Sequence, residues 1–418
     1  MSHAMMISLG LLVVCFLIRM PIAIGMIISS TLYLAVKGMD PSVVVEIFTS
    51  KMYNNFILLA VPLFIFAANI MNSSKVTDKV FDFSKVLVGR WKGGLGHVNV
   101  IASLIFSGMT GSAVADASGL GIMEIEAMRK EGYDDGFSAA ITAGSAVIGP
   151  IFPPSIPLVI YGVIAGASIG NLFLAGMVPG IILALALCIY VCYIANKRNY
   201  PSGRKYAGME FIRMTVSAIP ALLTPIILLM EAGAVAALYA LLISIFAYRS
   251  MTLPEFIQVL KNTVKSTGQI GIMLGAAYVF SYVIAVENLP SLAGNLILSF
   301  ATTKVTFLIF VNIILFILGM LLDSAVLQLV LLPILCPIAQ SLGIDMVHFG
   351  VVFTLNTMIG LCTPPFGMLL FIVTGISGEK MNTIIKEVMP MVLVMVLVLI
   401  LVTFVPDVIM WLPRLFGR

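Results

Sequence analysis

The sequence predicts an all-α polytopic membrane protein made of two inverted-topology repeats. Three observations support this fold class: an apolar composition, landmarks that recur at one constant offset, and an uneven distribution of Lys and Arg. Of the 418 residues, 61% are hydrophobic and only 10% are charged, whereas a soluble domain carries about 25% charged residues. The composition excludes a soluble enzyme, a disordered scaffold and a secreted disulfide module. The formal net charge of +4 is spread without a polybasic tract, which excludes nucleic acid as a partner.

Apolar stretches of about the 20 residues that cross a bilayer recur along the chain. They cover residues 4–18, 21–37, 54–72, 134–167, 171–195, 212–229, 232–248, 267–286, 345–378 and 387–406. Two more, 94–128 and 304–341, are interrupted by Gly and polar residues and are predicted to be helical hairpins that enter and leave on one side. Residues 40–52 and 254–266 are expected to form interfacial helices. Residues 75–92 are expected to form an amphipathic surface helix or, alternatively, a solvated loop.

The repeat is visible as a constant offset of 211 residues, half the chain. This offset relates Gly108 to Gly319, Gly149 to Gly360, Pro153-Pro154 to Pro364-Pro365, Asn171 to Asn382, and Pro179 to Pro390. An internal repeat of this kind decides how the whole fold is interpreted. Suppose that each half crosses the membrane five times and has one hairpin that enters and leaves on the same side. Because five is odd, the second half then begins on the other side of the membrane from the first. The two halves are therefore predicted to be inverted.

The distribution of basic residues tests this topology, because Lys and Arg accumulate on the cytoplasmic side. With the N terminus placed outside, eighteen of the 23 Lys and Arg lie inside and five lie outside. The hairpin at 94–128 then opens to the cytoplasm, since both of its flanks are basic. Its repeat mate at 304–341 is expected to open to the outside.

Two predicted spans are broken by proline pairs at matched positions, within 149–155 and 360–366. Proline removes a backbone donor and disfavours helix in the residue before it. Unwound backbone at membrane depth is tolerated where it lines a cavity or is buried in protein. Its free carbonyls can ligate a cation, and the N terminus of the half-helix that follows favours an anion. Paired broken helices in inverted halves indicate the binding site of a transporter.

The middles of the two hairpins supply polar side chains near these breaks. They are Ser107, Thr110, Ser112 and Asp116 in the first hairpin, and Asp323 and Ser324 in the second. A carboxylate deep in a bilayer is a functional hypothesis by default. Hydroxyls, carbonyls and a carboxylate are hard oxygen ligands that suit an alkali cation. Asp323 is the better candidate ligand, because it lies at the end of its hairpin between apolar runs. The alternative role for Asp116 is to cap the helix that follows it.

Three segments resemble the large membrane subunit of TRAP (tripartite ATP-independent periplasmic) transporters: Ser107–Asp116, Ala143–Ser155 and Gly360–Gly367. The resemblance covers nearly the whole chain. It implies a sodium-driven importer of organic acids in the bacterial inner membrane, with a scaffold and a transport domain that moves as an elevator. It also implies a small four-helix membrane subunit, expected here as a separate chain, and a periplasmic substrate-binding protein. Among the family's substrates, overall resemblance favours sialic acid over C4-dicarboxylates.

The same resemblance implies site residues at the hairpin ends and helix breaks, with no catalytic residue. The expected Na+ ligands are Ser107, Gly108, Thr110, Gly111, Gly149, Pro150, Gly319, Asp323, Ser324, Gly360 and Thr363. The expected substrate-binding residues are Ser112, Asp116, Pro154, Ser155, Thr357 and Pro365.

The resemblance also divides the chain into a scaffold and a transport domain, and the distribution of basic residues predicts that the N terminus lies in the periplasm. Scaffold helices are expected at 1–93 and 197–303. The transport domain would comprise 94–196, with the hairpin 94–130 and the broken helix 134–167, and 304–386, with the hairpin 304–341 and the broken helix 345–378. Residues 387–418 would form a C-terminal membrane helix.

Three alternatives remain open from the sequence. A proton-coupled carrier would use the same architecture with a different driving ion. A channel would conduct without a binding protein. An intramembrane aspartyl protease would use Asp116 and Asp323, although neither lies in a Gly-x-Gly-Asp motif.

Overall fold

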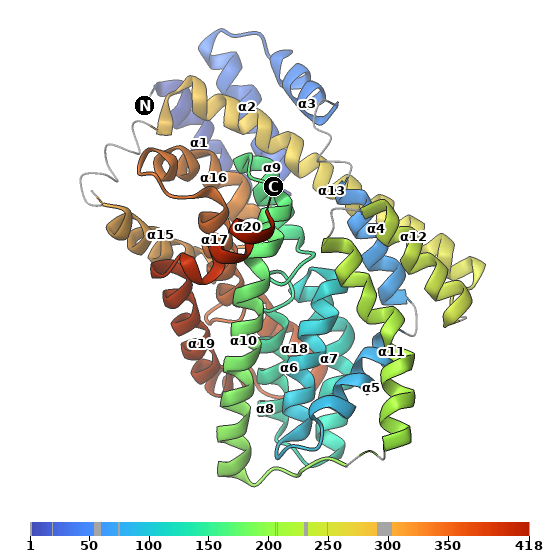
Figure 1. Ribbon diagram of the computed structural model, residues 1–418. Helices are drawn as coiled ribbons and strands as arrows, with labels where there is room; N and C mark the ends of the chain where they lie inside the picture. The colour runs from blue at the N-terminus through green and yellow to red at the C-terminus, as the bar shows by residue number, and fades with distance from the viewer. Residues whose placement is uncertain are drawn as a thin grey trace.

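The computed structural model describes residues 2–18, 20–53, 60–73, 76–204, 206, 208–229, 233–248, 250–290 and 303–417. Within these ranges the regular structure is helical, apart from one isolated β-bridge between Lys92 and Ser202 (Figure 1). The all-α prediction is therefore confirmed. In the described part of the chain, α10, α13, α16 and α19 are long and apolar enough to cross a membrane, and most of the shorter helices are also apolar.

The helices of the first half run from the N terminus to residue 198. They are α1 (His3–Leu17), α2 (Ile22–Lys37), α3 (Val43–Tyr53), α4 (Ala60–Ser73), α5 (Val76–Val88), α6 (Gly94–Thr110), α7 (Ala113–Lys130), α8 (Asp135–Ala146), α9 (Ile156–Ala165) and α10 (Ile169–Arg198). The helix expected within 75–92 is thus observed as α5, and the solvated-loop alternative is wrong for Val76–Val88.

The second half contains a matching series of helices. They are α11 (Gly208–Leu229), α12 (Gly233–Leu242) with a π-helical end (Ile243–Ala247), α13 (Leu253–Val286), α15 (Lys304–Gly319), α16 (Ser324–Ser341), α17 (Met346–Leu361), α18 (Met368–Ser377), α19 (Met381–Phe404) and α20 (Asp407–Phe416). The repeat offset relates both ends of α7 to both ends of α16, and it relates the start of α8 to the start of α17. The offset seen in the sequence therefore also relates helix boundaries, while the inverted sense of the halves stays a prediction.

Short polar residues and glycines set many of these boundaries. Ser168 and Thr303 accept hydrogen bonds from backbone N–H groups in the first turns of α10 and α15, which are donors that no earlier residue can satisfy. Gly38 and Gly166 end α2 and α9 with φ of +73° and +66°, a left-handed conformation that glycine adopts without a steric penalty.

Two predicted boundaries are wrong. Residues 387–418, expected to form one C-terminal membrane helix, lie on α19 and α20, which are separated at Val405 and Pro406. The expected interfacial helix at 254–266 and the expected span at 267–286 are one continuous helix, α13, of 34 residues. Thr252 and Glu255 form a reciprocal capping box at its start, and Pro254 occupies its first turn, where a missing N–H costs nothing. No proline follows before Val286, so nothing in the backbone chemistry stops the helix. The segment at the matching offset in the first half, by contrast, is divided into α3 and α4.

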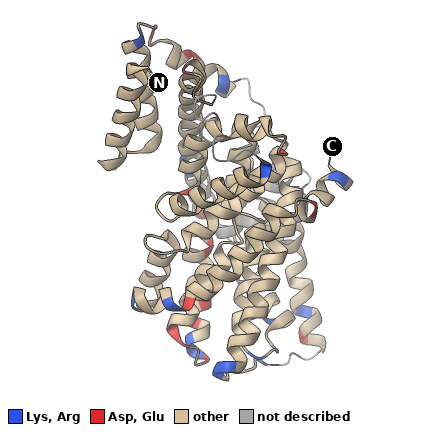
Figure 2. Ribbon diagram, turned by 90° about the vertical axis from the view of Figure 1, so that its left-hand side faces the viewer, with Lys and Arg blue, Asp and Glu red and all other residues tan. Residues whose placement is uncertain are grey.

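The helices form two groups that meet where α13 packs on α9 and α16, and where α4, α5 and α11 pack on α6. At one edge, α13 packs against α2, α3 and α4 (Figure 1). In the other group the two halves of the chain interleave, because α16 packs on α9 and α18 packs on α7 and α8. Charged residues gather at the lower end of this group, and long stretches of helix above it carry none (Figure 2).

Glu287 joins three chain segments at the end of α13. Its carboxylate accepts hydrogen bonds from the backbone N–H and hydroxyl of Ser2 at 3.1 and 2.7 Å, from the hydroxyl of Tyr33 at 2.7 Å, and from the ammonium of Lys37 at 2.7 Å. The bonds from Lys37, Ser2 and Tyr33 lower the pKa of Glu287 to about 2. These bonds hold the start of α1 and the last turns of α2 against the end of α13.

This depressed pKa predicts a loss of stability in acid. The contribution of Glu287 is complete above its unfolded pKa of about 4.5 and is lost as the pH falls towards 2, because the unfolded chain then binds a proton that the folded state excludes. We expect the thermal midpoint of wild type to fall over that range and that of Glu287→Gln to change less. Thermal unfolding in detergent measures this. Glu46→Gln, an exposed change on α3, should keep the wild-type profile.

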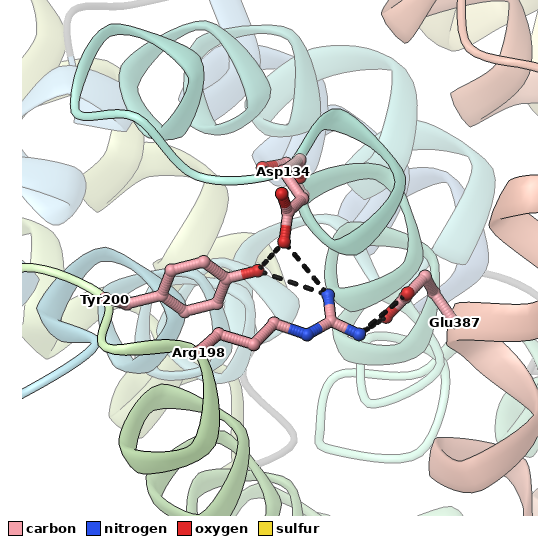
Figure 3. A network of polar contacts seen from close by, with 5 residues as sticks. Asp134, Arg198, Tyr200 and Glu387 are labelled. Atoms are coloured by element: carbon pink, nitrogen blue, oxygen red, sulfur yellow. Dashed lines mark hydrogen bonds and ion pairs between the residues drawn. The ribbon is translucent and has the colours of Figure 1, made fainter.

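Arg198 connects three helix ends in the interleaved group (Figure 3). Its guanidinium donates to Asp134 at 3.1 Å and to both oxygens of Glu387 at 2.8 and 2.9 Å. Tyr200 also donates to Asp134. These residues belong to the start of α8, the end of α10 and the first turns of α19, so the network fixes α8 and α19 against α10.

Replacing Arg198 with alanine should lower the free energy of unfolding by about 1 kcal/mol, since partly exposed pairs are weak but this guanidinium pairs with two carboxylates at once. Arg198→Lys should recover only part of this, because an ammonium cannot reach both carboxylates as a planar fork. Thermal unfolding of the purified protein measures both variants. Arg414→Ala, which removes a single exposed pair with Asp407, should leave the midpoint unchanged, and an equal effect of the two alanine variants would contradict the prediction.

Candidate functional site

A cavity of about 150 Å³ lies where the ends of the two hairpins meet. One hairpin is α6–α7 and the other is α15–α16, and each pair of helices is in contact. The cavity lining comes from both hairpins, from the first helix break and α9, and from α17. The lining residues are Gly111, Ser112, Ala113, Val114, Pro150, Ile156, Pro157, Ile160, Asp323, Ser324, Ala325, Met358 and Leu361.

Three helix N termini meet at this cavity. Ser112 caps α7 by accepting from the N–H of Ala115 at 3.4 Å. Asp323, which the repeat offset relates to Ser112, caps α16 by accepting from the N–H of Ala325 at 2.9 Å. Ser155 caps α9, whose first residues line the cavity. The partial positive charge of each N terminus favours an anion, so the arrangement suits a carboxylate ligand.

The capping role proposed as an alternative for Asp116 is therefore wrong, because Ser112 caps α7. Asp116 is 2% exposed and lies within the body of the hairpin rather than in the cavity lining. Asp323, by contrast, lines the cavity. Capping occupies its Oδ1 atom, and its second carboxylate oxygen is not used by that bond.

Each hairpin end touches the helix break of its own half through backbone atoms. Gly111 has a φ of +58°, and a Cβ placed on it would lie 2.5 Å from the carbonyl oxygen of Pro154. A Cβ on Gly360 would lie 2.5 Å from the carbonyl carbon of Gly319 and 2.7 Å from its oxygen. Each contact places one backbone carbonyl, that of Pro154 in the first half and that of Gly319 in the second, where the hairpin end meets the helix break. Backbone carbonyls are ligands that a hard cation prefers.

The hydroxyl groups predicted as ligands have different hydrogen-bond partners. Ser324 and Thr357 are buried and hydrogen bonded to each other at 2.8 Å. Thr363 donates to the carbonyl of Ile359 at 2.7 Å, and Ser107 donates to the carbonyl of Leu104. The hydroxyl of Thr110, at the end of the first hairpin, is buried without a hydrogen-bond partner in the part of the chain that the structure describes. Its oxygen is thus available to a bound cation.

The structure brings most of the predicted residues to one region, in two layers. Gly111, Ser112, Pro150, Asp323 and Ser324 line the cavity. Gly149, Pro154 and Thr357 contact these lining residues, and Gly319 and Gly360 contact each other beside Thr357. Outside both layers, Pro365 is exposed, and the buried Ser155 donates to the carbonyl of Pro150.

Sequence reasoning missed the apolar part of the lining. Ile156 and Pro157 follow the first helix break directly, so their position beside Ser155 was a usable signal. Met358 and Leu361 come from α17, and no local pattern distinguishes them from ordinary packing residues. Only the approach of α17 to the hairpin ends makes them part of the cavity.

Comparisons with known proteins agree with the motifs. The family model for the tripartite ATP-independent periplasmic transporter, DctM component, matches residues 9–408. The chain is 42% identical over 373 residues to the sialic acid TRAP transporter large permease protein SiaM of Vibrio cholerae, covering 87% of each chain. It is 38% identical to the sialic acid TRAP transporter permease protein SiaT of Haemophilus influenzae, covering 99% of this chain and 69% of that one.

A solved structure shows the same fold. The YdaH transporter of Alcanivorax borkumensis superposes with a TM-score of 0.59 at 12% identity, covering 86% of each chain. The relatives are named as transport proteins, which makes the aspartyl protease alternative wrong. The chain therefore belongs to the DctM family, the large permease component of tripartite ATP-independent periplasmic transporters, and is a multi-pass protein of the bacterial inner membrane.

Proposed function

We propose that this permease imports an organic acid by sodium-coupled secondary active transport, with sialic acid as the favoured substrate. The observation that carries the proposal is the convergence of three capped helix N termini on one cavity between the hairpin ends. Sialic acid is favoured because SiaM and SiaT, both named for it, are 42% and 38% identical to this chain. A C4-dicarboxylate presents the same carboxylate chemistry and is the alternative substrate.

Sodium coupling is supported by the oxygen atoms around the cavity. The carbonyl of Pro154 lies beside Gly111, and the carbonyl of Gly319 lies beside Gly360. Thr110 offers an oxygen at the first hairpin end, and Asp323 offers one at the second. Bound Na+ ions would hold each hairpin end against its helix break and complete the cavity for the substrate carboxylate. A proton would not use several carbonyls at once, which favours sodium over a proton as the driving ion.

An elevator motion is supported by the grouping of the helices. The predicted scaffold contains α13, which packs along α2, α3 and α4 and meets the cavity-bearing helices through α9 and α16. The hairpins, broken helices, α10 and α19 would move together as the transport domain. The network around Arg198 would help this domain to move as one body, because it links α8, α10 and α19.

The partners follow from the same proposal. A small four-helix membrane subunit would cover part of the predicted scaffold, where α11 exposes Ile212, Val216 and Ile219. A periplasmic binding protein would deliver the substrate to the outer side. The N terminus would lie in the periplasm.

Reconstitution into proteoliposomes with the small subunit tests the function. Uptake of labelled sialic acid and of a labelled C4-dicarboxylate would be measured, each with its cognate binding protein. We expect sialic acid uptake that requires both the binding protein and an inward sodium gradient. Uptake driven by a pH gradient without sodium would instead establish a proton-coupled carrier, and flux independent of the binding protein and far faster than carrier turnover would establish a channel.

A further inference from the structure

The chain passes between the predicted scaffold and the predicted transport domain twice in its first half, and the two connections lie side by side. One leads from α5 to α6 and contains residues 89–93. The other leads from α10 to α11 and contains residues 199–203. An antiparallel β-bridge between Lys92 and Ser202 joins these two segments, which we call the paired connectors. The transport proposal above does not use this contact.

Backbone hydrogen bonds hold the paired connectors together. The N–H of Gly93 donates to the carbonyl of Pro201 at 3.0 Å, and the N–H of Gly203 donates to the carbonyl of Gly89 at 3.0 Å. Each connector thus donates one bond and accepts one, as neighbouring antiparallel strands do. Bonds in both directions fix the register of the two segments, so they cannot slide along each other without breaking both.

Glycine allows this close approach. Gly93 has a φ of +74°, a left-handed conformation that glycine adopts without strain, and a Cβ on it would lie 2.5 Å from the Cβ of Ala195 on α10. A Cβ on Gly203 or on Gly94 would overlap the carbonyl oxygen of Gly89. A side chain at Gly203 would therefore push the two connectors apart.

Aromatic side chains attach both connectors to helices of the predicted transport domain. Tyr200 lies against Tyr133 and Phe137, with ring centroids 4.5 and 5.3 Å away. Trp91 lies edge-on to His97 on α6, with ring centroids 5.3 Å apart. Aromatic pairs at such separations contribute stability beyond the area that they bury. The paired connectors are thus held against the start of α8 and the first turns of α6.

The contacts change on the scaffold side of the paired connectors. Arg204 comes next in the chain and pairs with Glu210 on α11 at 3.4 Å. The N–H of Gly89 donates to the carbonyl of Lys85, so the first connector continues directly from the last turn of α5. α5 also packs on α11. The two helices that lead from the paired connectors to the scaffold are therefore in contact with each other.

We propose that the paired connectors are a single hinge element that stays intact through the transport cycle and moves with the transport domain. The inference rests on the elevator motion of the proposed function. Two separate connections would allow the domain to tilt, because each could bend on its own. Two connections bonded at one place bend together, so α5 and α11 must swing as a pair. Bending then occurs on the scaffold side of Gly89 and Gly203, at the ends of helices, where hinge residues commonly lie.

A disulfide across the bridge tests whether the paired connectors stay together. Residues opposite each other in an antiparallel pair have Cα atoms about 4.5–5.5 Å apart, a separation that a disulfide spans. Lys92 and Ser202 are exposed, so both can be replaced with cysteine. We expect the oxidised Lys92→Cys/Ser202→Cys protein, reconstituted with the small subunit and the binding protein, to take up labelled sialic acid at the rate of its reduced form.

Uptake that stops on oxidation and returns with a reducing agent would overturn the inference, because the connectors would then have to separate during transport. Each single-cysteine variant, treated with the same oxidant, is the control. It accounts for the loss of the bond that the Lys92 ammonium donates to Asn199 at 3.0 Å, and for native thiols such as the exposed Cys192.

Gly203→Ala tests whether the pairing matters for transport. The added Cβ would displace the carbonyl of Gly89 and weaken the bond that Gly203 donates to it. We expect the maximal uptake rate to fall about fivefold, the factor that one hydrogen bond carries. The half-saturating concentration of sialic acid should not change, since no residue of the cavity is altered.

Gly208→Ala is the matched control, because a Cβ on this residue at the start of α11 meets nothing within 4 Å. It should keep wild-type kinetics, and equal kinetics of the two alanine variants would overturn the inference. Failure of the proposed function gives a different result. Wild type that takes up no sialic acid, or takes it up without a sodium gradient, overturns the proposed substrate or driving ion. The connector tests then use whichever labelled acid wild type transports, because each compares a variant with its own reduced or control form.

Discussion

Replacing Asp323 with alanine is expected to abolish sodium-dependent uptake. The side chain has two roles: its Oδ1 atom caps α16 by accepting from Ala325 at 2.9 Å, and the residue lines the cavity between the hairpin ends. Loss of the cap alone would cost about 1 kcal/mol. Loss of the cap destabilises the start of α16, whereas loss of the carboxylate removes an ion ligand. Asp323→Ala causes both losses, so a second variant is needed to separate the two roles.

The repeat supplies the variant that separates them. Ser112 occupies the equivalent position in the first half and caps α7 with a hydroxyl. Asp323→Ser should therefore keep a cap and recover most of the stability that Asp323→Ala loses. If the carboxylate binds sodium, Asp323→Ser should still lack sodium-dependent uptake in proteoliposomes. Uptake restored to wild type in Asp323→Ser would reduce Asp323 to a structural cap and remove it from the mechanism.

Gly360→Ala is expected to lower uptake at least about tenfold, because a displacement of even about 1 Å in a binding site is costly. The added Cβ would lie 2.5 to 2.8 Å from three backbone atoms of Gly319. Backbone cannot rotate away as a flexible side chain can, so the end of α15 must move from the second helix break. Overpacking of this kind typically costs about 1–3 kcal/mol of stability.

Gly375→Ala is the matched control for this variant. Gly375 lies on α18 of the same repeat, and a Cβ there meets nothing within 4 Å. Alanine also favours helix over glycine by about 1 kcal/mol, so this variant should unfold at the same or a higher temperature and keep wild-type uptake. Wild-type uptake by Gly360→Ala would mean that the close approach of Gly319 and Gly360 is not required for transport. Proteoliposome uptake and thermal unfolding, measured on both variants, distinguish a site defect from misfolding.

Much of the fold could be predicted because the bilayer and the backbone restrict it. Long apolar stretches without charge have few alternatives to helix in a membrane, and proline pairs cannot sit within an unbroken helix. The breaks between α8 and α9 and between α17 and α18 fall where the proline pairs predicted them. The division of 254–286 into two helices was wrong because a change in polarity along a segment does not end a helix when the backbone contains no breaker.

The candidate site was predictable only in part, for a related reason. Gly111, Ser112, Pro150, Asp323 and Ser324 were predicted from interruptions in apolar sequence and lie together in the cavity lining. The roles of the two acids could not be read in the same way. Asp116 and Asp323 both follow a hairpin end, but the bond to Ala325 and the burial of Asp116 depend on where the neighbouring backbone and helices lie.

The sequence by itself determined the helical membrane fold, the constant offset between the halves and the positions of the hairpin ends and breaks, since these follow from local composition and from proline and glycine chemistry. Only the tertiary structure decided that three helix N termini share one cavity and that Met358 and Leu361 line it. Each of these is a contact between helices far apart in the chain. No local pattern encodes such contacts, because they depend on how apolar faces of similar composition pack against one another.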